Sequence, residues 1–389
     1  MRRQGARSAP MMLPRTQSTH RAGLAGALVA LALLLVVPAA AGASVSFRIL
    51  GHGYGHGVGM SQWGAYGYAQ HGAGYRKIAT HYFKGTRIGT VREARTIKVL
   101  LDTSDGVSFS RATRACGHDL QPSRTYRASL SGDSKVRLER ANGKRIDGCH
   151  AQLVAKGAGG PIQIGGQGAY RGDLVAAASG GTLYVINQLG LDGYVAGVIP
   201  NEMPSSWPLA ALQAQAVAAR SYALATSAGG GLFDQYDDTR SQVYGGFSTE
   251  TDATNKAVRR SERKVLQYEG EVIPAFFSSS SGGRTENVEY GFPGASPQPY
   301  LKSVRDPYDD ASPDHRWKET RTRRQMQSML SGLVKGRFQG IRVTKRGVSP
   351  RIVSAKILGS GGSTRVTGAD LRYRLELRST WAKFRLIRG

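Results

Sequence analysis

The sequence is poor in acidic residues. Its 389 residues include 27 Asp and Glu against 53 Lys and Arg, which gives a formal charge of +26. A charge of this sign attracts polyanions at long range, although it would also serve solubility alone. The sequence begins with a candidate export signal and has no recognisable nucleic-acid-binding motif, so we expect anionic wall polymers or lipid headgroups as partners and no nucleic acid.

Cysteine is nearly absent. In an oxidising exterior, a disulfide between Cys116 and Cys149 is the simplest outcome. The neighbouring His118 and His150 raise the alternative of a metal site, but Cys-Gly-His and Cys-His are not usual ligand spacings. We therefore expect a disulfide and no metal.

The one long apolar run is too short for an ordinary membrane span. It covers 22–37, whereas a spanning helix needs about 18 to 20 apolar residues. Arginines precede it and the small residues Ala41-Gly42-Ala43 follow, which is typical of a cleaved export signal. We predict a signal peptide over 1–43 and a secreted, wall-associated protein, with an uncleaved anchor as the alternative. Removing 1–43, which holds five arginines and no acid, lowers the formal charge from +26 to +21.

No Pro-rich or Ser-rich linker divides the remaining residues, so 44–389 is expected to form one large or two intimately packed domains. Short β-branched or apolar runs between Gly, Asn and Asp turns predict a β-rich part over 96–190. These runs are Ile97–Leu101, Gln152–Val154, Ile162–Ile164 and Leu183–Ile186.

The clearest predicted helix is rich in alanine. Ser205 or Ser206 is expected to cap it, and the glycines at 229–231 to end it. Its buried stripe at helical spacing comprises Leu209, Leu212, Ala216, Ala219 and Ala223. Further helices are expected at 250–262, 322–333 and 367–374, and further strands at 265–268, 272–277, 340–343 and 352–358. Helices and strands do not alternate regularly, so we predict an α+β fold with a central Ala-rich helix.

Glu202 is the candidate catalytic group. Apolar residues and prolines surround it in the sequence, and such surroundings raise the pKa of a carboxyl and keep it a proton donor near neutral pH. The alternative is a helix-terminus carboxylate with a structural role.

A glycine-dense stretch over 51–69 indicates close backbone approach or unusual torsions. In an extended strand, His52, Tyr54 and His56 would share one face, where they would contact substrate, hold a metal or form structural hydrogen bonds. No third ligand lies nearby, which disfavours metal. The stretch lacks the strand and the acidic residue of a dinucleotide-binding loop.

A second cluster, Phe277 to Asn287, offers hydroxyls and backbone amides that could bind sugar hydroxyls or an anion, or form only a polar turn. The Gly-x-Ser-x-Gly motif of serine hydrolases is absent, so we do not expect a serine nucleophile.

Four stretches together carry a specific resemblance. They are Glu202-Met-Pro with Gln215-Ala-Val-Ala-Ala-Arg220, Ser280-Ser-Gly-Gly-Arg-Thr285-Glu, Pro299-Tyr-Leu-Lys302 and Gly55-His-Gly-Val-Gly-Met-Ser-Gln62. The chain resembles the stage II sporulation protein D family, also called the SpoIID/LytB domain. This resemblance implies a SpoIID-like mixed fold over 44–389, with a Gly-His element at 51–90 and a catalytic-like part at 191–389.

The order of these stretches differs from the family pattern. In the sporulation protein the Gly-His element follows the rest of the domain, whereas here it comes first, as if circularly permuted. Permutation is easy when the ends of a domain lie together, so we expect the termini of 44–389 to be neighbours. Some relatives carry a Cys/His zinc site near the serine-glycine cluster, but that stretch has no cysteine here, so zinc is not expected.

The resemblance implies a lytic transglycosylase that cuts peptidoglycan glycan strands with Glu202 as general acid/base and no metal or cofactor. By their positions in the matching motifs, the residues expected to line the groove are His56, Ser61, Gln62, Gln215, Arg220, Ser280 and Thr285. Gln215 and Arg220 are alternatively buried structural residues. Other relatives are described as enhancers of a wall amidase, so a non-catalytic peptidoglycan-binding role beside an amidase partner is the alternative function.

Overall fold

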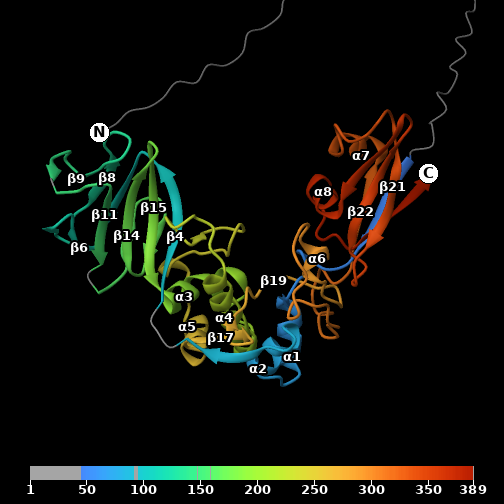
Figure 1. The fold of residues 1–389 in the computed structure, drawn as a ribbon, viewed down its shortest axis with the longest axis horizontal. Coiled ribbons are helices and arrows are strands. Elements are labelled where there is room, and N and C mark those ends of the chain that lie inside the picture. The colour runs from blue at the N-terminus through green and yellow to red at the C-terminus, as the bar shows by residue number, and fades with distance from the viewer. Residues whose placement is uncertain (1–44, 92–94, 147, 158, 389) are drawn as a thin grey trace, which may run out of the picture. The chain divides into compact units, whose positions relative to one another are not determined.

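The computed structural model describes residues 45–91, 95–146, 148–157 and 159–388. The expected signal peptide over 1–43 lies outside these described residues. Strands in several sheets combine with helices, and the predicted α+β class is confirmed (Figure 1). Within the described part of the chain, no helix is long and apolar enough to cross a membrane.

The expected β-rich part forms two antiparallel-dominated sheets. The seven-stranded sheet has the order β16-β4-β15-β14-β11-β6-β7, and the six-stranded sheet has the order β10-β9-β8-β5-β12-β13. In the central strands apolar residues face inward, as in β4 (Thr96–Ser104) and β15 (Thr182–Gly190). The other strands of the larger sheet are β16 (Gln235–Tyr236), β14 (Asp173–Ser179), β11 (Gln152–Gly157), β6 (Ala112–Ala115) and β7 (His118–Asp119). Those of the smaller sheet are β10 (Arg145–Ile146), β9 (Val136–Arg140), β8 (Tyr126–Leu130), β5 (Gly106–Ser110), β12 (Ile162–Ile164) and β13 (Gly168–Tyr170).

A disulfide joins the two cysteines of this β-rich part. Cys116 directly follows β6 and Cys149 lies shortly before β11, and their Cα atoms are 4.9 Å apart. The bridge closes a loop with a sequence separation of 33 residues. It therefore ties an outer hairpin to the sheet.

A helical layer surrounds α4 (Leu209–Ala225). This helix contacts α1 (Gln62–Gln70), α2 (Tyr75–Tyr82), α3 (Leu191–Glu202), α5 (Asp252–Arg260) and the strand β17 (Lys264–Tyr268), as Figure 1 shows for α3, α5 and β17. Alanine side chains make such close approach possible, and the predicted central Ala-rich helix is present.

The predicted ends of this helix are wrong. Pro208, and not a serine, occupies the N-cap without a side-chain hydrogen bond, because Ser205 and Ser206 lie in a turn closed by the Trp207 amide and the Pro204 carbonyl. The helix ends at Ala225, where the Thr226 hydroxyl donates to the Tyr222 carbonyl.

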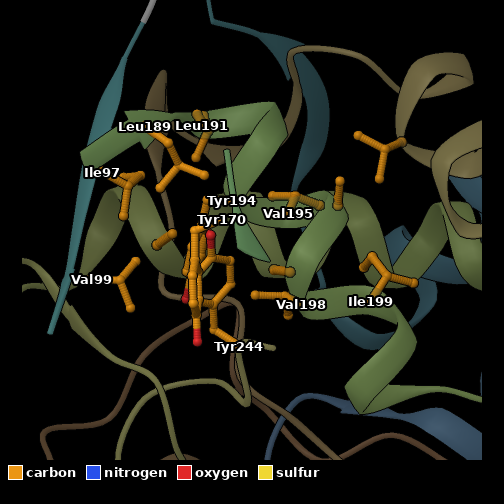
Figure 2. Packing of buried hydrophobic residues seen from close by; sticks show 14 of the residues in the cluster. Ile97, Val99, Tyr170, Leu189, Leu191, Tyr194, Val195, Val198, Ile199 and Tyr244 are labelled. Atoms are coloured by element: carbon orange, nitrogen blue, oxygen red, sulfur yellow. The ribbon is translucent and has the colours of Figure 1, made fainter. Parts of the chain in front are cut away.

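Helix α3 is held against the seven-stranded sheet by a closely packed cluster (Figure 2). Ile97 and Val99 of β4 and Leu189 of β15 lie on the sheet side of this cluster. Leu191, Tyr194, Val195, Val198 and Ile199 come from α3, and Tyr170 and Tyr244 complete the packing. Because the Tyr244 hydroxyl donates to Asn187 Oδ1 at 2.6 Å, the cluster also satisfies its buried polar groups. The rigid packing of α3 fixes the position of Glu202 at its end.

The two ends of the described chain pair in one sheet. Strand β1 (Val45–Gly51) lies between β20 (Trp317–Thr322) and β24 (Ala382–Arg388), antiparallel to both. Val45 is in register with Arg388, so the predicted proximity of the termini is confirmed.

A second hydrophobic core is formed by residues of this sheet, of the sheet β21-β22-β23 and of helices α7 and α8. The elements are α7 (Arg323–Met329), β21 (Phe338–Arg346), β22 (Ile352–Gly359), β23 (Gly362–Thr367) and α8 (Gly368–Arg374).

Short pairings connect the Gly-His element to the rest of the fold. Strand β2 (Met60–Ser61) pairs in parallel with β19 (Phe277–Ser278), so the serine-glycine cluster lies beside it. Strand β17 pairs with β3 (Arg87–Thr90) and with β18 (Glu271–Val272). The remaining short helices are η1 (Phe247–Thr249) and α6 (Val288–Gly291).

Candidate functional site

Glu202 is the last residue of α3 and is half-buried. Its Oε1 accepts a hydrogen bond from the Val243 backbone N–H at 2.8 Å. The amide of Gln62 donates to the Glu202 backbone carbonyl at 3.0 Å and lies 3.4 Å from Oε2. The first helix of the Gly-His element therefore reaches the candidate carboxylate, as the permutation hypothesis requires.

Burial raises the pKa of Glu202 above its ordinary value, and the hydrogen bonds from Val243 and Gln62 oppose this shift by favouring the charged form. The carboxylate also lies at the C-terminal, partially negative end of α3, which disfavours its ionisation. No charged neighbour among the described residues contributes to the shift. Glu202 therefore holds its proton to a higher pH than an ordinary glutamate does.

The Gly-His loop is not an extended strand. Four alternate residues, Gly53, Gly55, Gly57 and Gly59, have positive φ between 72° and 104°. At Gly59 a Cβ atom would lie 2.1 Å from the Phe276 carbonyl oxygen, so only glycine fits. As a result the histidines do not share one face. The His52 ring stacks on Trp381 with centroids 4.8 Å apart, and the His56 ring packs beside Phe292 at 4.9 Å.

His56 stabilises this loop from within. Its Nδ1 accepts the Val58 backbone N–H at 3.0 Å, and the ring is also hydrogen-bonded to the backbone of Phe277. Burial, and secondarily the charge of Arg372, lower its pKa to about 4, against the opposing hydrogen bond. The imidazole is therefore neutral at physiological pH and both its nitrogens have partners. The structure gives it a structural role in the loop.

Ser61 and Ser280 both donate to one buried carboxylate. The distances from their hydroxyls to Asp309 are 2.7 Å and 2.8 Å, and the Ser61 oxygen also accepts the Gly64 N–H at the start of α1. Asp309 further accepts the backbone N–H groups of Ser281 and Gly282. These hydrogen bonds connect the serine-glycine cluster to the Gly-His element, and they engage the hydroxyl groups of both serines.

Asp309 and its neighbour Asp306 escaped the sequence analysis. Asp306 accepts hydrogen bonds from the hydroxyls of Tyr82 and Ser281, each at 2.7 Å, and burial together with Asp309 raises its pKa to about 7. Both lie in irregular backbone after the Pro299-Tyr-Leu-Lys302 motif, where no periodicity marks buried positions. Among the described residues, no group of three or more His, Cys, Asp or Glu side chains is arranged to hold a metal ion.

The other expected groove residues are buried. Thr285 accepts the Val304 N–H at 2.8 Å. Arg220 is 0% exposed and donates to Asp192, at 2.5 Å and 2.8 Å, and to the carbonyls of Ala216 and Lys264. Of the two roles considered for Arg220, these contacts favour the structural one.

Gln215 is also 0% exposed, and its amide has no hydrogen-bond partner among the described residues. It is the one buried candidate whose polar atoms are not already used by the fold.

Three aromatic rings, two from the Gly-His element and one from the turn after Glu202, form one cluster. Trp63 follows Gln62 and Trp207 comes five residues after Glu202, and their ring centroids are 4.8 Å apart. Tyr66 packs against both, at 5.5 Å and 4.9 Å. All three are half-buried. The signal available in the sequence was Trp207 within a Pro-bounded turn next to the candidate carboxylate.

Residues 179–268 match the family model described as stage II sporulation protein, SpoIID. The chain carries a SpoIID domain. The matched segment contains α3, Glu202, α4 and α5, so the candidate carboxylate lies inside it. The sequence-based recognition of the SpoIID/LytB family is confirmed.

Curated relatives carry names of the same family. The chain is 44% identical over 139 residues to "Amidase enhancer" of Bacillus subtilis (strain 168), which is 36% of this chain and 18% of that protein. It is 30% identical over 211 residues to "Stage II sporulation protein D" of the same organism, and 32% identical over 213 residues to the protein of that name in Bacillus amyloliquefaciens. Each of the latter alignments covers 50% of this chain and 60% of the relative, so the chain spans less than two thirds of the length of these relatives.

Proposed function

We propose that this is an exported protein that cleaves the glycan strands of peptidoglycan as a lytic transglycosylase. The observation that carries the proposal is the half-buried carboxylate of Glu202, which has a raised pKa and is hydrogen-bonded by Gln62 from the Gly-His element. A general acid requires a proton at neutral pH, and burial supplies the condition for keeping it.

A single carboxylate suffices for this reaction. Glu202 donates its proton to the glycosidic oxygen as the bond to the anomeric carbon of muramic acid breaks. The C6 hydroxyl oxygen of the same sugar then bonds to that carbon, and its proton returns to Glu202. The product is a 1,6-anhydro ring, no water is consumed, and the carboxyl group is regenerated. Hydrolysing glycosidases instead use a pair of carboxylates, whereas no second charged group adjoins Glu202 among the described residues.

The aromatic cluster of Trp63, Tyr66 and Trp207 supports a glycan as substrate. Aromatic rings offer flat apolar faces with a polar edge, which suit the apolar faces of sugar rings. Trp63 is adjacent to Gln62, which contacts Glu202, so a strand stacked on these rings would run close to the carboxylate. The strong positive charge adds a long-range attraction for acidic wall polymers.

The second candidate function is a non-catalytic enhancer of a wall amidase. The 44% identity to the relative named amidase enhancer favours it. In that case the protein would bind peptidoglycan and an amidase without cutting, and Glu202 would serve only to join α3 to α1 and to the Val243 loop.

The deciding experiment compares the protein lacking 1–43 with its Glu202→Gln variant on intact and on peptide-stripped glycan strands. Mass spectrometry detects 1,6-anhydromuramic ends. We expect such ends from the wild-type protein alone, while Glu271→Gln, an exposed carboxylate replaced in the same way, keeps full activity.

Three other outcomes change the assignment. Reducing ends would mean hydrolysis. Absence of products with retained glycan binding would favour the amidase enhancer, tested next by adding a wall amidase. Full activity of Glu202→Gln would remove Glu202 from the mechanism.

A further inference from the structure

A cleft of about 800 Å³ lies on the side of the Gly-His loop formed by α8 and the turn that follows it. Its volume is in the range of about 300 to 1,000 Å³ typical of ligand sites. The residues that characterise it are Tyr54, His56, Arg372, Tyr373, Arg374 and Arg378. Glu202 is not among the residues that line it, so the cleft is separate from the candidate catalytic carboxylate.

Backbone hydrogen bonds hold the two walls of the cleft together. The Gly55 N–H donates to the Arg378 carbonyl at 2.9 Å, and the His52 N–H donates to the Trp381 carbonyl at 3.0 Å. The Ser379 hydroxyl donates to the His52 carbonyl at 2.6 Å. The cleft is therefore a built feature of the fold, made where the two ends of the described chain meet.

The charge of the cleft is unbalanced. Three arginines line it against one carboxylate, Glu376. Of these arginines only Arg378 forms an ion pair with a described residue, Asp314, which lies outside the lining. Arg372 donates only through Nε, to the Leu377 carbonyl at 3.3 Å, and no carboxylate of the described residues pairs with it. Burial lowers its pKa, and only an electrostatic interaction with Tyr54 opposes this shift, so the partly desolvated guanidinium has no carboxylate counter-charge among the described residues. A bound anion would supply that charge.

The neutral side chains of the cleft favour a sugar chain as the carrier of the anion. Tyr373 is 83% exposed and Tyr54 is 46% exposed, which places both among the few large apolar side chains of the described residues that are open to solvent. The planar guanidinium fork matches carboxylate and phosphate oxygens with two parallel hydrogen bonds. The neutral ring of His56 adds no charge of its own at physiological pH.

We propose that this cleft binds an acidic saccharide or polyol chain, with Arg372 and Arg374 holding its anionic groups and Tyr54 and Tyr373 packing on its apolar faces. This proposed binding site is separate from Glu202, and the proposal does not depend on cleavage at Glu202. The same anion chemistry could come from a carboxylated glycan or from a phosphodiester-linked wall polymer. Either would anchor the protein to the wall through a contact distinct from the cut strand.

The test measures affinity by isothermal titration calorimetry at about 150 mM salt, where nonspecific attraction is screened. The probes are oligogalacturonate for carboxylates, glycerol-phosphate oligomers for phosphodiesters, and neutral chitotetraose. We expect an acidic probe to bind, and Arg372→Gln/Arg374→Gln to weaken it about tenfold or more, because two charge-assisted contacts are lost. The probe that binds identifies the source of the anion.

Matched variants separate a site from bulk charge and from misfolding. Arg365→Gln removes one exposed positive charge that does not line the cleft, and we expect less than a twofold effect. Tyr373→Ala/Arg374→Gln changes two exposed side chains that form no hydrogen bond, ion pair or ring contact with other described residues, and it should weaken binding even if the Arg372 variant is unstable. Glu202→Gln should bind the acidic probe like wild type, whatever the outcome of the cleavage assay.

The proposal is overturned by any of three results. Neither acidic probe binds, or chitotetraose binds as tightly as the acidic probes, or Arg365→Gln reduces affinity as much per charge as the cleft variants.

Discussion

Replacement of Arg220 by methionine tests whether this buried arginine supports the fold or the substrate. The guanidinium is 0% exposed and connects three elements, because it donates to Asp192 at the start of α3, to the Lys264 carbonyl of β17 and to its own helix α4. Methionine has a similar length but no donor. The substitution therefore keeps most of the packing and removes every one of these hydrogen bonds.

The expected loss of stability follows from what is left behind. Breaking a fully buried ion pair costs roughly 3 to 5 kcal/mol. The side chain of Asp192 is 32% exposed and keeps some water, which reduces the penalty, while the Lys264 carbonyl loses a buried donor and adds to it. We expect Arg220→Met to lower the free energy of unfolding by about 2 to 4 kcal/mol.

Urea denaturation followed by circular dichroism measures this change. Arg259→Met on the neighbouring α5 is the matched control, since Arg259 is exposed and should change stability by less than about 0.5 kcal/mol. A double-mutant cycle with Asp192→Asn isolates the pair. If Arg220→Met had the same urea midpoint as the wild type but bound glycan strands more weakly, the structural assignment of Arg220 would be refuted. Arg220 would then be a substrate-binding residue of the groove.

Four further outcomes are expected. Cleavage should decline as pH rises through the raised pKa of Glu202, because the proton donor is lost there, and the decline should lie at higher pH than for an ordinary glutamate. Gln62→Leu, which removes a donor that favours the carboxylate, should move that decline to still higher pH, and an unchanged pH profile would exclude Gln62 as a positioning residue. The lowering of the His56 pKa from 6.5 to about 4 corresponds to roughly 3 kcal/mol in the free energy of unfolding. This stability is present above pH 6.5 and is lost as the pH falls towards 4, because the unfolded chain binds the proton more readily. The His56→Gln variant should not show this loss when its free energy of unfolding is measured against pH. Cys116→Ser/Cys149→Ser should lower the free energy of unfolding by about 3 to 4 kcal/mol in the entropic model, measured in urea, without changing cleavage.

The sequence predicted those helices and strands whose local residue pattern favours the same conformation that packing imposes in the folded protein. The strand expected at 162–164 is β12, and the helices expected near 250–262 and 367–374 appear as α5 and α8 with slightly different ends. Each of these helices begins with a threonine capping box, a signal that acts within a few residues.

Helix α3 was missed because its sequence argues against a helix. Gly193, Gly197 and Pro200 lie within it, and its residues from Tyr194 to Ile199 are buried without a break, so it shows no amphipathic period. Packing decides its conformation. At Gly197 a Cβ atom would lie 2.5 Å from the Tyr244 ring, so the glycine that weakens the helix is also what lets it approach its neighbour.

The residues of the candidate site also differ in how far the sequence alone could assign their roles. Motif matching brought Gln62 and Glu202 together correctly, because residues shared by a family mark a common geometry. Motifs cannot tell a residue that touches substrate from one that holds the loops in place. Ser61 and Ser280 hold Asp309, and Thr285 accepts the Val304 amide, so all three act as anchors in this structure. The contacts of Ser61 with Asp309 and of Tyr82 with Asp306 join segments more than 200 residues apart, which no local pattern reveals.

The position of β1 between β20 and β24 has a consequence for the order in which the protein folds. The first described strand finds both its neighbours only near the far end of the chain, with pairing such as Val45 with Arg388. Contacts of such sequence separation close late and slowly. The amides of the Gly-His loop donate to the carbonyls of Arg378 and Trp381, so this loop is completed only after those residues have been synthesised. A chain cut short before Arg378 would keep Glu202 on its helix but would lack these contacts in the loop that leads to Gln62.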